Sequence, residues 1–493
     1  MKRCLPRPAA LGFAAAVLVL TPSAARANGN VSHQWISRTA AEGTPAGGSL
    51  AALVGDPALR QALYTGTMFP DWGYTPGVTT AERDAGEASH WEPVQDAYRR
   101  WIVAQYAPPW SDEARLHLAF YFGMTSHGIA DQTYDSMFFE RSRVYENKDH
   151  ADFDRDSDVM WAASTGPGET PTLWVPSDPL IELFSTVIGA EVDPASMKGK
   201  LGLVSLAILA VSTSAEDPEM VAEAELAFPW AAAHDDDPAV PGNPPLEAVV
   251  ARRYWRSNWA LLHGDALPRP VLWSYPADGG AEHAPAAASI ESWVSVVFAR
   301  AIDEQALSAD QFHIVDSTDM PAPFTIDLFY GNGSHVVHLK PTSDLIEDEV
   351  YVVTVDPGVK TIHGESLDGW SFTFSTGLGG PPPLHDDGFW DQPDPYGEPG
   401  GESSGGPDET GSASSSGEGS GDPPTGGLVG TAGPGSTGDG STGAGAGEDT
   451  SAGGCGCAAS TEPPLRGLGL AVLLAFGARR RRHALTLGFG LRL

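Results

Sequence analysis

A long low-complexity segment near the C-terminus sets the first limit on what this chain can fold into. From 379 to about 454 the sequence consists of Gly, Ser, Pro, Thr, Asp and Glu, with almost no aliphatic residues. Such a segment cannot bury enough apolar area to offset the entropy of ordering its backbone. We therefore expect residues 378–454 to form an extended, disordered linker, and the packed part of the 493-residue chain to precede it.

The part before this linker divides where its hydrophobic periodicity changes. In the first half, apolar residues recur with the helical period over segments such as 91–106 and 111–135. Further on, short alternating runs are separated by turn clusters such as Tyr330-Gly331-Asn332-Gly333. The sequence therefore predicts a multidomain protein, with an all-α domain over residues 28–265 and a small all-β sandwich over residues 270–377.

Both ends of the chain carry segments typical of an exported surface protein. A Met-Lys-Arg start, an apolar run and Ala25-Arg26-Ala27 have the form of a secretory signal peptide over residues 1–27. Its removal would make Asn28 the first residue of the mature chain. Residues 455–493 contain two cysteines, a short apolar run and an arginine cluster, an order that resembles the C-terminal sorting signals of myxobacterial surface proteins. We therefore predict an exported protein, attached to the cell envelope through this segment or secreted.

Charge and cysteine content limit the partners and the metal ligands. A formal net charge of -35 disfavours attraction to nucleic acid, so a nucleic-acid partner is not expected. The three cysteines are Cys4, Cys455 and Cys457, which lie in the predicted signal peptide and tail. Any metal in the globular part must therefore be bound by nitrogen and oxygen, donors that suit zinc in hydrolytic sites.

The residues that can carry chemistry form two runs with the same spacing. His127, Asp131 and Asp135 stand four residues apart in a predicted helix, so an imidazole and two carboxylates should project from nearly one face. His150 and Asp154, with a further aspartate four residues on, repeat the pattern. One such run is commonly a solvated polar face. Two runs in one helical domain favour a multinuclear metal site between neighbouring helices.

Further candidates lie upstream of these runs. Asp71 follows Phe-Pro at a turn, His90 precedes a helix, and His33 lies five residues after the predicted cleavage site. Each could instead be an ordinary turn or helix-start residue, because functional and structural polar groups share such positions. The aromatic residues beside these candidates could line the rim of a site or pack in a core; they are Trp72, Tyr74 and Trp91.

Together these motifs resemble the zinc-dependent phospholipases C, the related phospholipases that cleave glycosylphosphatidylinositol anchors, and the fungal single-strand nucleases. The shared pattern is an Asp in a Phe-Pro-Asp turn, a His before Trp, a His-x-x-x-Asp on a helix, and a further His-x-x-x-Asp or Glu. The segments 66–71 and 150–159 are most similar to the anchor-cleaving phospholipases. The resemblance covers residues 28–160.

This resemblance implies a fold, a cofactor and a ligand set. It implies an all-α zinc hydrolase domain with up to three zinc ions, and it gives Asp71 a second role as general base or orienter of the attacking water. The implied ligands are, for the first zinc, Asp71, His90, His127 and Asp131; for the second, His150, Asp154 and Asp135; and for the third, Asp131, His33 and the amino group and carbonyl of Asn28. Asp135 stands where relatives usually have a further histidine.

The β segment resembles a different family, the bacterial Ig-like modules. The resemblance rests on Ser-Tyr-Pro-Ala-Asp-Gly-Gly at 274–280 and on the strand Ser-Val-Val-Phe at 295–298. It implies a role in spacing or adhesion rather than in catalysis. His335 and His338 lie in this module, and we expect them at its surface.

Three functions remain open at this point. The first is an extracellular phosphodiesterase of the phospholipase C type, which uses metal-activated water on phospholipid head groups. The second is a single-strand nuclease with the same zinc site, which the acidic charge disfavours because such binders usually present a positive groove. The third is a noncatalytic adhesion protein with a degenerate metal site, favoured by Asp135 in place of a histidine.

Overall fold

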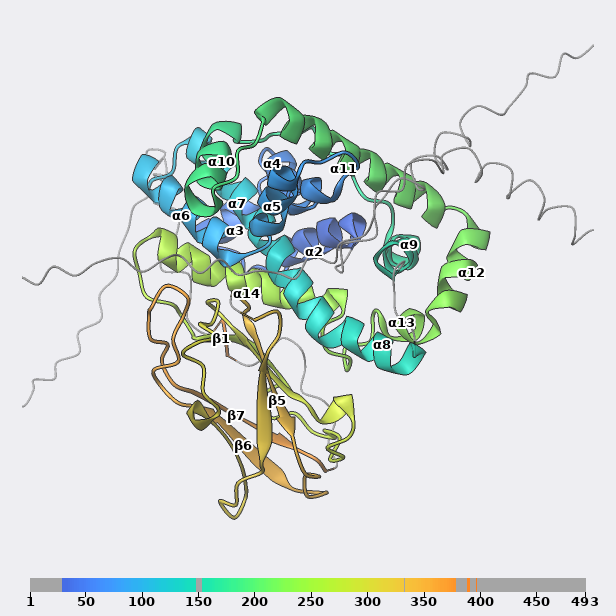
Figure 1. Ribbon diagram of the computed structural model, residues 1–493, viewed down its shortest axis with the longest axis vertical. Coiled ribbons are helices and arrows are strands. Elements are labelled where there is room, and N and C mark those ends of the chain that lie inside the picture. The colour runs from blue at the N-terminus through green and yellow to red at the C-terminus, as the bar shows by residue number, and fades with distance from the viewer. Residues whose placement is uncertain (1–28, 148–152, 332, 378–387, 391–395, 397–493) are drawn as a thin grey trace, which may run out of the picture. The chain divides into compact units, whose positions relative to one another are not determined.

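The computed structural model has a helical part followed by two small β-sheets (Figure 1), and it describes residues 29–147, 153–331, 333–377, 388–390 and 396. Helices and strands belong to one compact unit. The predicted helical part followed by a β-sandwich is confirmed. Asn28, His150, the predicted signal peptide and the predicted C-terminal segment lie outside the described residues.

The predicted site residues lie on or beside a subset of the helical segments. These segments are α2 (Asn30–Glu42), η1 (Pro70–Tyr74), α5 (Thr80–Ser89), α6 (Glu92–Gln105), α7 (Asp112–Thr133), η2 (Tyr134–Phe139) and α9 (Phe153–Thr165). The other helical segments before the strands are α3 (Ser49–Val54), α4 (Arg60–Thr67), α8 (Glu140–Glu146), α10 (Ser177–Leu183), η3 (Phe184–Ile188), α11 (Pro194–Ala215), α12 (Pro218–Ala227), α13 (Pro229–His234) and α14 (Pro244–Leu262).

Helix α7 is the central element of the helical part. It begins after Ser111, whose side chain accepts a hydrogen bond from the Ala114 amide, and its first turn carries acidic residues that favour the positive end of the helix dipole. From His117 to its end almost every residue is buried, so α7 is surrounded by other helices. At Thr133 the α-helix continues directly into the π-helical segment η2.

Two glycines allow α4 to approach α7 backbone to backbone. A Cβ on Gly123 would lie 2.1 Å from the Leu63 carbonyl oxygen and 2.6 Å from the Thr67 amide nitrogen. A Cβ on Gly66 would lie 2.1 Å from the Phe120 carbonyl oxygen. Side chains at either position would push the helices apart. This close packing brings the end of α4 next to the middle of α7.

The strands form two antiparallel sheets. One sheet has the order β1 (Val271–Tyr275), β2 (Val294–Phe298), β5 (Val336–Pro341), β4 (Phe324–Leu328), and the other has the order β3 (Phe312–Asp316), β6 (Val350–Val355), β7 (Trp370–Ser375). Their inner faces share a core that includes Val296, Phe298, Val353 and Phe372. The expectation that His335 and His338 lie at the module surface is wrong: their exposed fractions are 1% and 0%.

The strands and the helices also share one hydrophobic core. Leu272, Trp273, Val297 and Val336 from the β region belong to the same buried cluster as the helical core. The side chain of Arg253 on α14 donates to the carbonyl oxygen of Leu272 at 2.7 Å. The β module and the helices are therefore joined by a continuous hydrophobic core.

Some residues of the predicted linker also pack on the helical part. Phe389 is buried and lies under the guanidinium of Arg253, 4.9 Å from the ring centroid. Trp390 and Tyr396 also pack against the helical core, and Tyr396 stacks on His263 with a centroid distance of 3.8 Å. Aromatic side chains thus bind these linker positions to the helices.

Helix α11 has an unusual composition for its place in the fold. Among the described helices it is the one long and apolar enough to cross a membrane by length and composition, and 44% of its apolar window is buried. It packs against α9, α2 and η1, and it exposes Leu203, Leu206 and Leu209. Core helices of soluble proteins pass the same test, so this property assigns no membrane span.

Candidate metal centre

Two helices, the end of a third and one 3-10 turn bring a group of histidine and aspartate side chains together. His127 and Asp131 lie one turn apart on α7, His33 lies on α2, His90 is the C-cap of α5, and Asp71 is in the first turn of η1. Gly128 permits the approach of His90, because a Cβ there would lie 2.2 Å from the His90 carbonyl oxygen. We call these five residues the His/Asp cluster.

The ring nitrogens of two histidines are oriented by backbone carbonyl groups. His127 Nδ1 lies 2.7 Å from the Thr67 carbonyl oxygen, and His90 Nδ1 lies 3.0 Å from the Gly86 carbonyl oxygen. A carbonyl only accepts, so each Nδ1 must carry the proton and donate it. Each Nε2 is then the nitrogen that can present a lone pair to the centre of the cluster when a metal replaces its proton. Protein histidines that bind metals are usually held in this way.

Asp131 lies between the histidines and directs its two oxygens to different sides. Its Oδ1 is 2.9 Å from His33 Nε2, and its Oδ2 is 3.2 Å from His127 Nε2 and 3.5 Å from His90 Nε2. One carboxylate therefore faces two separate groups of nitrogen ligands. This is the arrangement that a carboxylate needs in order to join two cations.

Asp71 completes the cluster. Its Oδ1 lies 3.6 Å from His90 Nε2 and 3.7 Å from His127 Nε2. Its Oδ2 accepts a hydrogen bond of 2.8 Å from the Asn30 side chain, which fixes the carboxylate. Sequence reasoning did not include Asn30, which lies close to the predicted start of the mature chain. Its contact with a residue 41 positions away left no pattern in the sequence.

The facing atoms of the cluster are buried, but they do not satisfy one another. His33, His90 and Asp131 are 1%, 6% and 6% exposed, and His127 is fully buried. Both ring nitrogens of His33, Nε2 of His90 and His127, and one oxygen each of Asp71 and Asp131 have no hydrogen bond of acceptable geometry. Unpaired buried polar atoms are costly, and so many in one place call for a bound cation.

Electrostatics in the metal-free cluster follow from this crowding. Burial opposes the charge of His90, but the adjacent carboxylates of Asp71 and Asp131 raise its pKa to about 9. Burial and the nearby His33 lower the pKa of His127. For Asp131, burial is outweighed by His127 and His33, which hold its pKa below the ordinary value. A cation that replaced these protons would be favoured by the same carboxylates.

The geometry divides the cluster into two groups that could hold a metal ion. His33, His127 and Asp131 form one group, and Asp71, His90 and His127 form the other, with all ligand atoms in a group within 4.8 Å of one another. Nitrogen and carboxylate donors without thiolates fit zinc or a similar divalent ion. The residues present therefore fit such an ion.

Other residues of the predicted ligand set lie apart from the cluster. Among the described residues, Asp135 and Asp154 belong to neither group. Asp135 lies in the π-helical segment η2, where the backbone no longer follows the α-helical period, so the expected common face of α7 ends at Asp131. Asp135 is buried and accepts a hydrogen bond from the Tyr330 hydroxyl. Asp154 lies in the first turn of α9.

The last aspartate of the second run has a capping role. Asp158 accepts hydrogen bonds from the backbone amides of Val31 and Ser32, at 3.2 and 2.7 Å, and from the Ser32 hydroxyl at 2.8 Å. It therefore caps the N-terminus of α2 from a different helix. Burial raises its pKa to about 6 despite these donors. Aspartates with the same sequence spacing thus have different roles, because Asp131 belongs to the His/Asp cluster and Asp158 caps a helix.

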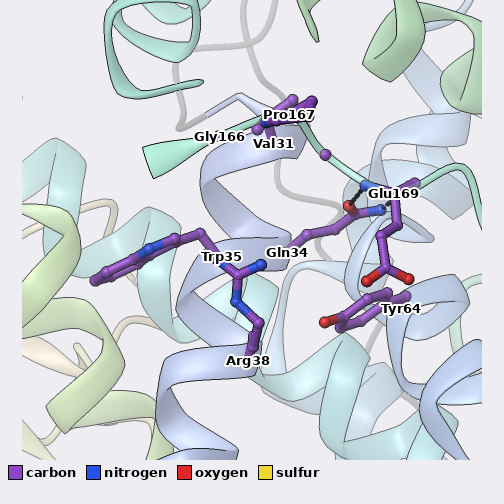
Figure 2. A pocket seen from close by; sticks show the side chains of 9 residues that line it. Val31, Gln34, Trp35, Arg38, Tyr64, Gly166, Pro167 and Glu169 are labelled. Atoms are coloured by element: carbon purple, nitrogen blue, oxygen red, sulfur yellow. Dashed lines mark hydrogen bonds between the residues drawn. The ribbon is translucent and has the colours of Figure 1, made fainter. Parts of the chain in front are cut away.

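The backbone of Glu169 also holds helix α2, through the side chain of Gln34 (Figure 2). The Gln34 side chain donates to the Glu169 carbonyl oxygen and accepts from the Glu169 amide, both at 2.8 Å. The depression that these residues border, together with Arg38 and Tyr64, encloses about 10 Å³. That volume holds at most one water molecule, so the depression is a contact that fixes α2 rather than a ligand site.

The aromatic residues beside the ligands have different positions. Trp72 is fully buried and packs near Phe69 and Phe184, so it belongs to the core. Tyr74 lies next to His90, and its hydroxyl donates to Glu87. Trp91 is partly exposed and packs edge to face on Tyr330 from the β module, at a centroid distance of 5.3 Å.

A second acidic and histidine group lies between α6 and the β module. Glu92, Asp96 and His363 have ligand atoms close enough to hold a metal. However, the Arg300 guanidinium already lies 3.0 Å from Glu92 and 3.1 Å from Asp96, and His335 lies 3.1 Å from Glu92. Burial is outweighed by Arg300, which holds the pKa of Glu92 well below its ordinary value. This group is an ion network that joins the module to α6.

Comparison with known proteins supports two parts of this description. A model of the bacterial Ig-like domain matches residues 265–376. The chain is 34% identical over 85 residues to a phosphatidylinositol-glycan-specific phospholipase D from Mus musculus, which covers 17% of this chain and 10% of that protein. The corresponding protein of Dictyostelium discoideum is 38% identical over 72 residues, or 15% and 7% of the two chains. The chain thus spans about a tenth of the length of the curated relatives it matches.

The solved structures that match this chain resemble it only weakly. A bacterial S-layer protein, SbsC, covers 66% of this chain and 46% of its own, with a TM-score of 0.19 and 10% identity. A likeness at that level carries no weight for fold or function. Ig-like modules of the matched kind are typical of bacterial surface and extracellular proteins.

Proposed function

We propose that this chain is an extracellular zinc-dependent phosphodiesterase that hydrolyses the head-group phosphodiesters of phospholipids. The observation that carries the proposal is the convergence of three histidines and two aspartates whose facing atoms are buried and unpaired. The similarity of a short part of the chain to phosphatidylinositol-glycan-specific phospholipases D supports phosphodiester hydrolysis as the chemistry.

The proposed ligand sets follow the two sides of Asp131. Asp71, His90, His127 and Asp131 would hold the first zinc ion, and His150 and Asp154 with Asp135 would hold the second. Asp131 and His33, with the amino group and carbonyl of Asn28, would hold the third. Zinc, when bound, supplies Lewis acidity that makes water nucleophilic near neutral pH and compensates charge on the phosphate.

The chain's own residues would prepare this chemistry. The Thr67 and Gly86 carbonyl groups keep the His127 and His90 rings in one tautomer and one orientation, so no rearrangement is needed for ligation. Asn30 holds one oxygen of Asp71, which leaves the other directed at the histidines. We therefore propose that Asp71 acts as a ligand and an orienter of the attacking water. We also propose it as the general base, through the oxygen that Asn30 leaves available.

The proposal includes the place where the enzyme works. Removal of residues 1–27 would create the Asn28 amine, so export and completion of the metal site would be one event. Residues 455–493 would attach the protein to the cell envelope. The Ig-like module supports a location outside the cytoplasm.

Metal analysis and product analysis test the proposal together. The mature protein should contain at least two tightly bound zinc ions per chain, and chelation should remove its activity. Release of phosphorylated head group and diacylglycerol from phosphatidylcholine or phosphatidylinositol vesicles would identify a phospholipase C. Phosphatidic acid as the product would instead identify the phospholipase D reaction named for the relatives.

Two results would contradict the proposal in different ways. Fewer than two zinc ions per chain would favour a noncatalytic surface protein with a degenerate site. Release of acid-soluble nucleotides from single-stranded DNA, without phospholipid hydrolysis, would identify the metal site as that of a nuclease.

A further inference from the structure

Helix α11 presents an apolar face at the outer edge of the helical part (Figure 1). The exposed side chains on this face include Leu203, Leu206 and Leu209, which we call the leucine stripe. Steps of three residues turn an α-helix by about 300°, so the three leucines lie within about 120° of its circumference. Together with Leu226 on the neighbouring helix α12, they are the exposed leucines among the described residues.

The leucine stripe lies on a helix whose charge differs from that of the whole chain. The sequence has 64 acidic and 29 basic residues, whereas Pro194–Ala215 contains two lysines, Lys198 and Lys200, and no acidic residue. Lys198 is exposed, and Lys200 donates to the Pro76 carbonyl oxygen at 2.7 Å. An apolar face without acidic residues and with a lysine at one end complements a phospholipid surface, in which acyl chains lie beneath phosphate groups.

The same helix packs on elements that carry the candidate metal centre. It contacts α2, α9 and η1, and η1 carries Asp71. The Ser205 hydroxyl lies 3.9 Å from Met68 Sδ, just before η1. Lys200 binds Pro76, just after η1, so α11 contacts the chain on both sides of this segment. Since a helix with its side chains is about 10–12 Å across, a surface bound to the outer face of α11 would lie about one helix diameter from η1.

The size of the leucine stripe favours a lipid surface over a second copy of the chain. Each partner in a standard protein interface buries about 800 Å². Three half-exposed leucine side chains supply much less apolar area than that. Side chains that insert among acyl chains need no such continuous area, because each buried apolar group is favourable by itself.

We infer that the leucine stripe of α11 is the surface through which this protein docks on a phospholipid bilayer, with the helix lying in the membrane interface and not across the bilayer. Docking on this face brings the metal centre close to head groups that remain in the membrane. The inference rests on the proposed function and deepens it, because it specifies that the substrate is hydrolysed at a membrane surface. Helices that lie in the interface combine an apolar face with lysine or arginine on the polar side.

The first experiment measures docking without catalysis. The full mature chain is mixed with phosphatidylcholine vesicles in the presence of a chelator, and the bound fraction is measured by flotation. Leu206→Glu combined with Leu209→Glu places two charges on the leucine stripe, at residues that are 44% and 54% exposed. The matched control combines Val350→Glu with Ile346→Glu in the Ig-like module, where the two residues are 49% and 54% exposed. Circular dichroism and urea unfolding establish that each variant is folded.

We expect the stripe variant to bind vesicles about 10-fold or more weakly, because charged side chains are unfavourable among acyl chains. The control variant should bind as the unmodified protein does. Unchanged binding by the stripe variant, an equal loss in the control variant, or no binding by the unmodified protein would overturn the inference. A dimer in sedimentation velocity that the stripe variant dissociates would also overturn it, because the face would then belong to a second copy of the chain.

The second experiment separates failure of the inference from failure of the proposed function. The zinc-loaded proteins are assayed on phosphatidylcholine vesicles and on a short-chain phosphatidylcholine below its critical micelle concentration. We expect the stripe variant to have a raised KM on vesicles and an unchanged kcat/KM on the monomeric lipid. If it hydrolyses vesicles as well as the unmodified protein does, the inference alone is wrong. If the unmodified protein binds vesicles but hydrolyses neither form of the lipid, the proposed function is wrong, and the leucine stripe is a lipid-docking surface without a catalytic role.

Discussion

Buried histidines occur in both the helical part and the Ig-like module, and they have opposite surroundings. His127 on α7 and His338 on β5 are each 0% exposed. His338 Nδ1 lies 2.8 Å from the Ser295 hydroxyl, and its ring packs near Trp293. Neither Nε2 has a hydrogen bond of acceptable geometry, but the Nε2 of His127 faces two carboxylates. Burial of a histidine alone therefore does not distinguish a ligand from a core residue; the facing groups do.

The pKa directions express the same difference. Burial and the charge of Lys340 lower the pKa of His338 to about 3, and burial lowers the pKa of His283 to about 4. In the cluster, burial is outweighed by Asp71 and Asp131, which raise the pKa of His90 to about 9. Burial thus favours the neutral form of His338 and His283. The His/Asp cluster instead places carboxylates beside its histidines, as a cation site requires.

The largest expected effect separates the two buried histidines directly. His127→Ala should abolish zinc-dependent phosphodiesterase activity and remove at least one bound zinc ion, because His127 belongs to both candidate metal groups. His338→Ala should leave zinc content and activity per folded molecule unchanged and should lower the free energy of unfolding, since it leaves a cavity and an unpaired Ser295. Zinc analysis, a vesicle assay and urea unfolding measure these quantities. Loss of zinc from His338→Ala would remove the distinction between the two regions.

The next effect concerns the charges that join the two regions. Arg300→Met should lower the free energy of unfolding by about 3–5 kcal/mol, because it leaves Glu92 and Asp96 buried with less compensation. Urea unfolding of the metal-free protein gives this value. We expect the loss in a single transition, since the module and the helices share a core. Two separate transitions in the unmodified protein would contradict that coupling.

Because buried His338 is neutral, we expect the free energy of unfolding to fall as the pH is lowered. Above the unfolded pKa of about 6.5 the stabilisation by neutral His338 is complete, and it is lost as the pH falls toward the folded pKa of about 3. Each such group contributes a slope of about 1.4 kcal/mol per pH unit in that window. His338→Gln should therefore reduce the loss of unfolding free energy between pH 7 and pH 5 by about 2 kcal/mol. Urea unfolding of the metal-free proteins at both pH values tests this, and equal losses in the variant and the unmodified protein would contradict it.

The sequence contained enough information for the order of the two parts and for the centre of the site. Helical periodicity gave way to alternation near the observed change from α14 to β1. The i, i+4 spacing of His127 and Asp131 reports a property of one helix, which local sequence controls, and the structure places both in the cluster. Recognition of Asp71 and His90 required a family resemblance, because each alone is an ordinary turn or helix-end residue.

The rest of the site depends on contacts between distant residues. The π-helical turn at η2 takes Asp135 away from the face of His127 and Asp131, and no residue pattern announced it. Asp158 has the same spacing as the candidate ligands, yet it caps α2 because α9 packs beside that helix. Tyr330 comes from a module whose docking on α7 no periodicity could predict. The spacing of residues in the sequence predicts the geometry within one helix, whereas tertiary packing determines which distant residue each side chain contacts.

The smallest expected effect comes from an ion pair on the exposed face of the module. Lys340 and Asp327 lie 2.6 Å apart on neighbouring strands, but their side chains are 27% and 44% exposed. Solvent and salt screen such pairs, so Asp327→Asn should lower the free energy of unfolding by less than about 1 kcal/mol. Urea unfolding at low salt and at about 0.5 M salt should show that even this difference shrinks. The buried ion pair of Arg300 with Glu92 has a nitrogen to oxygen distance of 3.0 Å, which is no shorter. If Asp327→Asn lost as much unfolding free energy as Arg300→Met, burial would not set the strength of ion pairs in this fold.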